Sequence, residues 1–170
     1  MTREEIRAIH GEADAQALYR EVCASGDFIG FARTYASDAD HRVARNALWT
    51  LTKATDAELS QLQPMLHTLI DQAMQPLHSS VRRLTLNIII RLAMGEEDLR
   101  TDFLDYCLAR MVDVEELPGI QSLAMKLAHR MCAFYPELHD ELIRTLQGME
   151  IEYYKPAVRS VRQHILRGNR

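Results

Sequence analysis

The sequence feature that most constrains the fold of this chain is an internal repeat. Four segments align without gaps on an apolar first residue, and these first residues are separated by 38, 39 and 38 positions. The segments are VARNALWTLTK from Val43, VRRLTLNIIIR from Val81, IQSLAMKLAHR from Ile120 and VRSVRQHIL from Val158. A period this regular is typical of stacked structural units, each of which covers its apolar face with its neighbours. We call the helix predicted at each segment an anchored helix.

The repeating unit is predicted to be a helical hairpin. Signals for β-structure are scarce, because the chain has 7 Gly and contains neither an Asn-Gly nor an Asp-Gly dipeptide. A second set of helices, which we call outer helices, is predicted between the anchored ones, over residues 27–36, 56–74, 98–112 and 136–147. Each unit would then be an outer helix followed by an anchored helix.

Several helix ends can be predicted from capping chemistry. Thr2 followed by Glu5 has the pattern of a capping box. Ser79 or Ser80 is a candidate N-cap for the second anchored helix. Two further helices are predicted to have a proline in their first turn, where it is tolerated: Pro118 and Pro156.

Over residues 26–167 the chain resembles HEAT-repeat proteins, which are relatives of the armadillo repeats. The matching features are Pro64 within a first helix, Asp38 or Asp40 in the turn, and the pairs Val81-Arg82 and Val158-Arg159 at the start of second helices. The resemblance implies an all-α fold, an alpha-alpha superhelix of about four HEAT-like hairpins. It also implies that the anchored helices line a concave face.

We expect a single HEAT-like domain over residues 1–170. Residues 1–25 lack an anchor in register and are predicted to form a divergent N-terminal cap, and residues 26–167 form the four repeats. In the first three anchored helices the fourth and fifth positions after the anchor are small or apolar, whereas the last helix has Arg162 and Gln163 there. A polar outer side is what a terminal unit of a stack requires.

Positive charge is concentrated on the anchored helices. They carry 12 of the 20 Lys and Arg and none of the 24 Asp and Glu, in a chain of net charge −4. The windows used are 41–54, 79–94, 119–135 and 155–167. On a helical wheel, the second, sixth and tenth positions after each anchor point away from the apolar side. These positions in successive repeats would form a basic strip along the concave face.

The basic strip contains the predicted partner-binding residues. They are Arg45, Trp49, Lys53, Arg83, Asn87, Arg91, Lys126, Arg130 and His164. Trp49 is the single tryptophan, and it is interpreted either as a binding anchor among cations or as a ring packed on a neighbouring helix. The alternative for the arginines is a solvated face, paired locally with acids such as Asp38 and Asp40.

The motifs of catalysis are missing from the sequence. There is no Gly-rich phosphate loop, no GxSxG and no HExxH, so we predict that the chain is not an enzyme and uses no metal or other cofactor. No small-molecule substrate is indicated. The nearest approaches to an acid–base pair are interpreted as surface pairs: His67 with Asp71, and His139 with Asp140.

Cysteine usage and hydropathy favour a cytoplasmic protein. Cys23, Cys107 and Cys132 are odd in number and widely spaced, which predicts reduced and mostly buried thiols. The N-terminal segment lacks the pattern of a secretory signal, and no apolar stretch is long enough to span a bilayer, so no membrane partner is predicted.

The sequence therefore predicts a non-enzymatic interaction or scaffold module that binds an acidic protein or peptide segment on a basic concave face. The alternative is binding of nucleic acid through its phosphate backbone, in which the chain would resemble non-catalytic relatives of the HEAT-like DNA-alkylation-repair proteins. A pI near 6.0 favours the protein partner, because nucleic-acid-binding domains usually have a broad basic surface.

Overall fold

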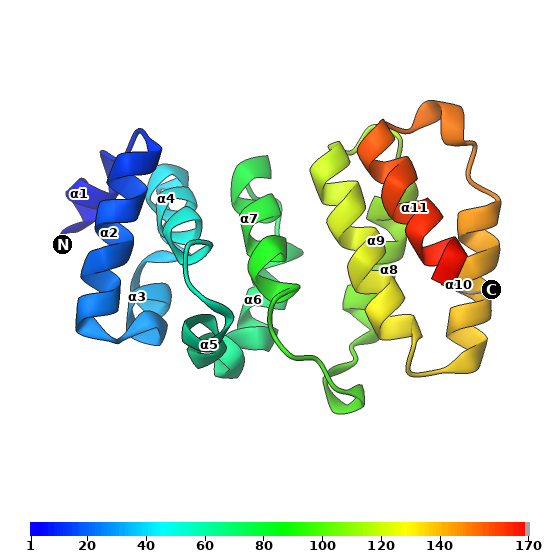
Figure 1. Ribbon diagram of the computed structural model, residues 1–170, viewed down its shortest axis with the longest axis horizontal. Helices are drawn as coiled ribbons and strands as arrows, with labels where there is room; N and C mark the ends of the chain where they lie inside the picture. Colours follow the sequence, from blue (N-terminus) through cyan, green and yellow to red (C-terminus); the bar gives the residue numbers. More distant parts are fainter. Residues whose placement is uncertain (169–170) are drawn as a thin grey trace. The chain divides into compact units, whose positions relative to one another are not determined.

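The computed structural model describes residues 1–168, and within that range all regular structure is helical (Figure 1). The α-helices are α1 (Arg3–Arg7), α2 (Glu12–Ser25), α3 (Phe28–Tyr35), α4 (His41–Leu51), α5 (Asp56–Leu59), α6 (Leu66–Ala73), α7 (Ser79–Ile89), α8 (Thr101–Val112), α9 (Pro118–Cys132), α10 (Pro136–Gln147) and α11 (Pro156–Gly168). Short 3₁₀ segments are η1 (Ser60–Met65), η2 (Glu96–Asp98) and η3 (Ile151–Tyr153). The predicted all-α hairpin architecture is confirmed, and α4, α7, α9 and α11 are the anchored helices.

The chain divides into two compact units, Met1–Ala93 and Met94–Arg170. In the first unit the anchored helices α4 and α7 pack side by side, while α3 packs on α4 and α6 packs on α7 (Figure 1). The two anchors, Val43 and Val81, are buried, and Leu48 and Leu86, five positions after them, are fully buried. The helical spacing of the apolar positions thus places one side of each of these anchored helices in the core.

The N-terminal segment is held to the first hairpin by a buried amide. α1 and α2 both pack on α4, and Asn46 of α4 is fully buried. Its Nδ2 donates to the carbonyl oxygen of Ile6 at 2.9 Å and to that of Ile9 at 3.3 Å. These carbonyls lie at and just after the C-terminal end of the short α1, so the buried amide finds acceptors there and fixes the end of α1 against α4.

Most of the predicted helix starts are confirmed. The Thr2 hydroxyl accepts from the Glu5 N–H at 3.2 Å, and the Glu5 carboxylate accepts from the Thr2 N–H at 2.6 Å, which completes the capping box. α9 and α11 begin at Pro118 and Pro156. Proline fits there because its fixed φ is helical and its missing N–H would be unpaired in any case.

The predicted cap of α7 is wrong by one or two residues. Ser79 and Ser80 already lie within the helix, and His78 is the N-cap. The His78 Nδ1 accepts the N–H of Ser80 at 3.3 Å and lies 2.8 Å from its hydroxyl oxygen. An imidazole nitrogen can serve here because a cap requires one acceptor within reach of the second or third N–H of the helix.

The outer helix predicted over residues 56–74 is interrupted. α5 is followed by the 3₁₀ segment η1, which contains Pro64, and only then by α6. Proline has no N–H to donate and its ring displaces the preceding turn, so the regular α-helix resumes at Leu66.

A carboxylate in the short helix α5 connects this helix to α2. Glu58 is half-buried, and it accepts from the Tyr19 hydroxyl of α2 at 2.6 Å, from the Thr55 N–H at 2.9 Å and from the Cys23 thiol at 3.1 Å. These bonds, the Tyr19 hydroxyl first, lower the pKa of Glu58 to about 2. The folded state therefore binds a proton at Glu58 less readily than the unfolded state does.

This difference predicts how stability depends on pH. A lowered pKa contributes stability above the unfolded value of about 4.5, and this contribution is lost as pH falls towards about 2. We expect Glu58→Gln to unfold more easily than the wild type above pH 4.5, and the difference to shrink as pH falls through this range. Urea unfolding of both proteins from pH 7 down to pH 2.5 measures this difference in the free energy of unfolding. A difference that stays constant over the range would contradict the role given to Glu58.

In the second unit α9 is the central helix, and α8, α10 and α11 all pack on it (Figure 1). The buried Gln121 of α9 donates to the carbonyl oxygen of Asp113, in the connection between α8 and α9, at 2.6 Å. The Tyr154 hydroxyl, in the connection before α11, donates to the carbonyl oxygen of Val112, at the end of α8, at 2.7 Å. The last helix, α11, is polar where the other anchored helices are buried, since Gln163 is exposed. Arg162, the other polar residue predicted on this side, is half-buried and its Nε donates to the carbonyl oxygen of Leu146 at 2.6 Å.

Candidate protein-interaction surface

The first unit has a groove between its two anchored helices. Its volume is about 370 Å³, and we call it the α4–α7 groove. The lining residues are Trp49, Thr52, Arg83, Leu84, Asn87 and Arg91. Four of these six were predicted as partner-binding residues from positions in two different repeats, so the stacking of α7 on α4 brings residues far apart in the sequence into one groove.

The positions of these side chains follow from the helical repeat. Arg83 and Asn87 are four residues apart on α7 and therefore lie one above the other on the same side. Leu84, one residue after Arg83, is buried and gives the groove an apolar wall. Trp49 is half-buried on α4, so part of its ring is accessible in the groove and part is covered.

Three hydrogen-bond donors in the α4–α7 groove have no acceptor within residues 1–168. They are the guanidinium of Arg83, which is exposed, the amide of Asn87 and the indole N–H of Trp49, both of which belong to half-buried side chains. A half-buried donor without a protein acceptor relies on solvent or on a bound partner for its hydrogen bond. The groove thus offers one fixed positive charge and two neutral donors around an aromatic ring.

Arg91 lines the same groove but has local acceptors. Its guanidinium donates to the carbonyl oxygen of Ala54 at 2.6 Å, to that of Thr52 at 3.2 Å and to the Asp56 carboxylate at 2.9 Å. The two carbonyls follow the end of α4 at Leu51 and lack helical partners. Arg91 therefore ties the end of α4 to α7, and its charge is largely used within the unit.

Lys53 is also paired locally. Its ammonium group forms an ion pair with Glu12 of α2 at 2.5 Å and lies 5.5 Å from the centre of the Trp49 ring. A cation at this distance from an indole ring attracts its π face and restricts its orientation. Lys53 thus positions Trp49. Arg45, one turn before Trp49, is half-buried and donates to the side chain of Asn46 at 3.2 Å.

The other predicted residues lie in the second unit. Lys126 is exposed on α9, Arg130 is half-buried one turn later, and His164 is exposed on α11, which packs on α9. Burial lowers the pKa of Arg130, although a guanidinium remains charged at any physiological pH. Burial and the neighbouring His139 and His164 lower the pKa of His129, which favours its neutral form. A basic strip continuous through all four repeats stays a prediction.

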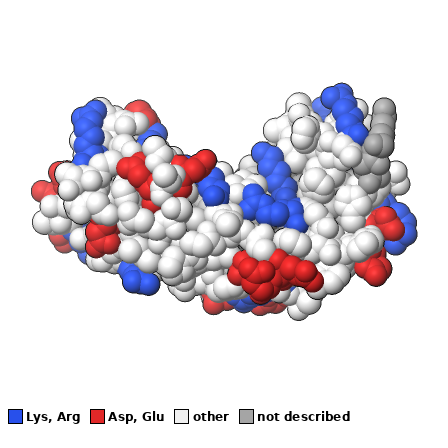
Figure 2. Space-filling view, turned by 60° about the horizontal axis from the view of Figure 1, so that its bottom comes forward, with Lys and Arg blue, Asp and Glu red and all other residues white. Residues whose placement is uncertain are grey.

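The turn acids are not the partners of the groove arginines. Asp38 binds Arg3 of α1 at 2.8 Å, and Asp40 binds Arg7 at 2.7 Å. Figure 2 shows several groups of basic and several groups of acidic side chains on one face of the molecule. Sequence reasoning did not find these pairs, because the N-terminal segment had no repeat register from which its neighbours could be inferred.

The candidate groups for metal binding and nucleophilic chemistry are the His, Cys, Asp and Glu side chains of the described residues. Among residues 1–168 there is no cluster of three or more His, Cys, Asp or Glu that could hold a metal ion. All three cysteines are free; Cys107 and Cys132 are buried, and burial raises the pKa of Cys132 to about 11. A thiol with so high a pKa is a poor nucleophile at neutral pH. No helix in this range is long and apolar enough to cross a bilayer.

The stacked hairpins and the open side-chain groove of the anchored helices define the class of the chain as an α-helical repeat protein. A family model described as a HEAT repeat domain matches residues 2–169, and the chain belongs to the HEAT-repeat family. HEAT repeats generally mediate protein–protein interactions and are typically non-catalytic scaffolds. Neither the curated proteins nor the solved structures compared with the chain provide a match.

Proposed function

We propose that the chain is a non-enzymatic interaction module whose α4–α7 groove binds an acidic segment of a protein partner. The observation that carries the proposal is the set of three donors without internal acceptors, at Arg83, Asn87 and Trp49. A carboxylate can accept from the guanidinium and from the neighbouring amide at once, and hydrogen bonds of this charge-assisted kind are the strong ones. The indole supplies apolar contact area and a further N–H.

The groove suits a side chain better than a phosphate backbone. One fixed charge with two neutral donors matches one or two carboxylates, whereas a nucleic-acid strand needs a row of cations to neutralise successive phosphates. Two of the cations predicted for such a row, Arg91 and Lys53, have acidic partners within the unit.

A binding titration separates the two partner classes. We expect a fluorescein-labelled peptide of alternating Glu and apolar residues to bind, and the same peptide with Gln in place of Glu not to bind. Labelled single-stranded and duplex DNA should bind more weakly than the Glu peptide and lose their residual binding as salt is raised. Fluorescence polarisation over a salt series measures all four probes. Tighter binding of either DNA than of the Glu peptide would contradict the proposal.

A further inference from the structure

The last helix carries a basic face that nothing in residues 1–168 neutralises. From Lys155 to Gly168 the chain has no acidic residue. A shallow depression of about 550 Å³ on α11 is lined by the side chains that we call the α11 basic face: Ile151, Pro156, Arg159, Arg162, His164 and Arg167. Arg159 and Arg167 are exposed and have no hydrogen-bond or ion-pair partner in the part of the chain that the structure describes.

The packing of α11 explains why this face is open. Val158 and Ile165 are its buried residues, and they bind the helix to α9. Arg162 is used in part, because its Nε donates to the carbonyl oxygen of Leu146 in α10 at 2.6 Å. At the fourth and fifth positions after the anchor the other anchored helices bury their side chains, whereas α11 has Arg162 and Gln163 there and leaves this side open.

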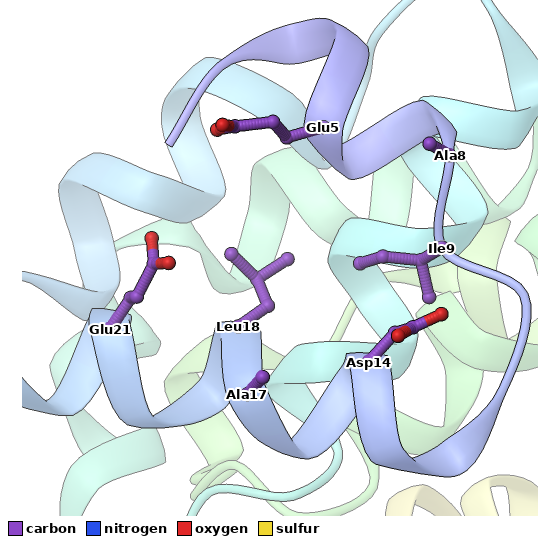
Figure 3. A pocket seen from close by; sticks show the side chains of 7 residues that line it. All are labelled: Glu5, Ala8, Ile9, Asp14, Ala17, Leu18 and Glu21. Carbon is purple, nitrogen blue, oxygen red and sulfur yellow. The ribbon is translucent and has the colours of Figure 1, made fainter.

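A surface of opposite charge lies on the first helices of the same chain. A pocket of about 340 Å³ lies between α1 and α2, and we call it the acidic pocket. Its floor includes Ile9 and Leu18, and its rim carries the carboxylates of Glu5, Asp14 and Glu21 (Figure 3). The side chains of Glu5 and Glu21 point into the space above Leu18 from opposite helices (Figure 3).

The acidic pocket keeps an excess of negative charge. The arginines of α1, Arg3 and Arg7, are turned to Asp38 and Asp40 and do not neutralise it. The Met1 amino group lies 3.4 Å from the Glu5 carboxylate and 3.9 Å from that of Glu21, so one ammonium group faces two carboxylates, while the third, Asp14, accepts the His10 N–H at 3.2 Å. The pocket therefore already accommodates one cation and has charge left for more.

We propose that the chain associates head to tail, with the α11 basic face of one copy docked on the acidic pocket of the next. Arg159 and Arg167 would pair with the rim carboxylates, and Ile151 and Pro156 would cover the apolar floor. Such a contact is heterologous, so each added copy again presents one free face of each kind and the assembly grows by further copies. Trp49, Arg83 and Asn87 take no part in it, which makes it independent of the function proposed above.

Sedimentation velocity of the full chain tests this association. In low salt the weight-average sedimentation coefficient of the wild type should rise with protein concentration, and high salt should reverse the rise, because exposed charges are screened. Neutralising either face, with Arg159→Gln and Arg167→Gln or with Asp14→Asn and Glu21→Gln, should weaken association at least about tenfold. An equimolar mixture of the two double variants should stop at a dimer, since only one intact interface can form.

The controls make the outcome decisive. Arg33→Gln with Arg144→Gln removes two exposed positive charges elsewhere and should leave association unchanged. Far-UV circular dichroism and the midpoint of urea unfolding confirm that each variant is folded. The proposal is overturned by a wild type that stays monomeric in low salt, by equal weakening in the control, or by a mixture that grows beyond the dimer. It is also overturned if the α11 basic face binds a DNA oligonucleotide and the chain does not self-associate.

Discussion

Replacing Arg83 by Glu should weaken binding of an acidic peptide by at least about thirtyfold. The change removes an attraction worth about 1 kcal/mol at an exposed position and adds a repulsion of similar size, and about 2 kcal/mol corresponds to this factor. Trp49→Ala should cost a similar amount through lost aromatic contact in a partly desolvated groove. Fluorescence polarisation with the Glu peptide measures both effects.

Arg33→Glu is the matched control, since it makes the same charge change at an exposed site on α3. It should leave peptide affinity within about twofold of the wild type. Arg91 is unsuitable as a binding test, because it donates to the carbonyls of Thr52 and Ala54 and its loss would disturb the end of α4. If Arg83→Glu and Arg33→Glu weaken binding equally, overall charge, and not the α4–α7 groove, recognises the peptide.

Leu86→Ala should destabilise the chain by about 2–5 kcal/mol, while Gln163→Ala should stay within about 0.5 kcal/mol of the wild type. Both residues lie five positions after an anchor, at Val81 and Val158, so they hold the same place in the repeat. Leu86 is fully buried, and its truncation leaves a cavity, whereas Gln163 is exposed on the terminal helix. Urea unfolding monitored by circular dichroism measures the two free energies of unfolding.

If the two substitutions lower the free energy of unfolding equally, the loss depends on the position in the repeat and not on whether a neighbouring hairpin covers the side chain. A loss of helical signal in Leu86→Ala without a shift in the unfolding midpoint would contradict a packing role for this side chain.

The repeat register was sufficient to predict the hairpins. All four anchors are buried, and α10 spans the residues predicted for it, 136–147, because an apolar period and a proline start agree there. The N-terminal segment could only be described as a cap. Its attachment depends on Asn46, a buried polar residue whose hydrogen bonds to Ile6 and Ile9 have no signature in the periodicity of either segment.

The α4–α7 groove was predictable in outline but not in its chemistry. A helical wheel is sufficient to place Arg83, Asn87 and Trp49 on the same side of adjacent helices. Which cations remain without partners depends on where α4 ends and on what the N-terminal helices contribute. Arg91 is engaged because α4 stops at Leu51, and Lys53 is engaged because α2 brings Glu12 to it.

The central claim, that the α4–α7 groove binds an acidic segment, can be tested most directly by NMR. Trp49 is the single tryptophan, so its indole N–H gives one ¹H–¹⁵N signal that needs no assignment by mutation. Titration with the Glu peptide should shift this signal to saturation, with the same apparent affinity as polarisation gives, and the Gln peptide should leave it in place. An indole signal that does not move while the Glu peptide binds would show that the peptide docks elsewhere.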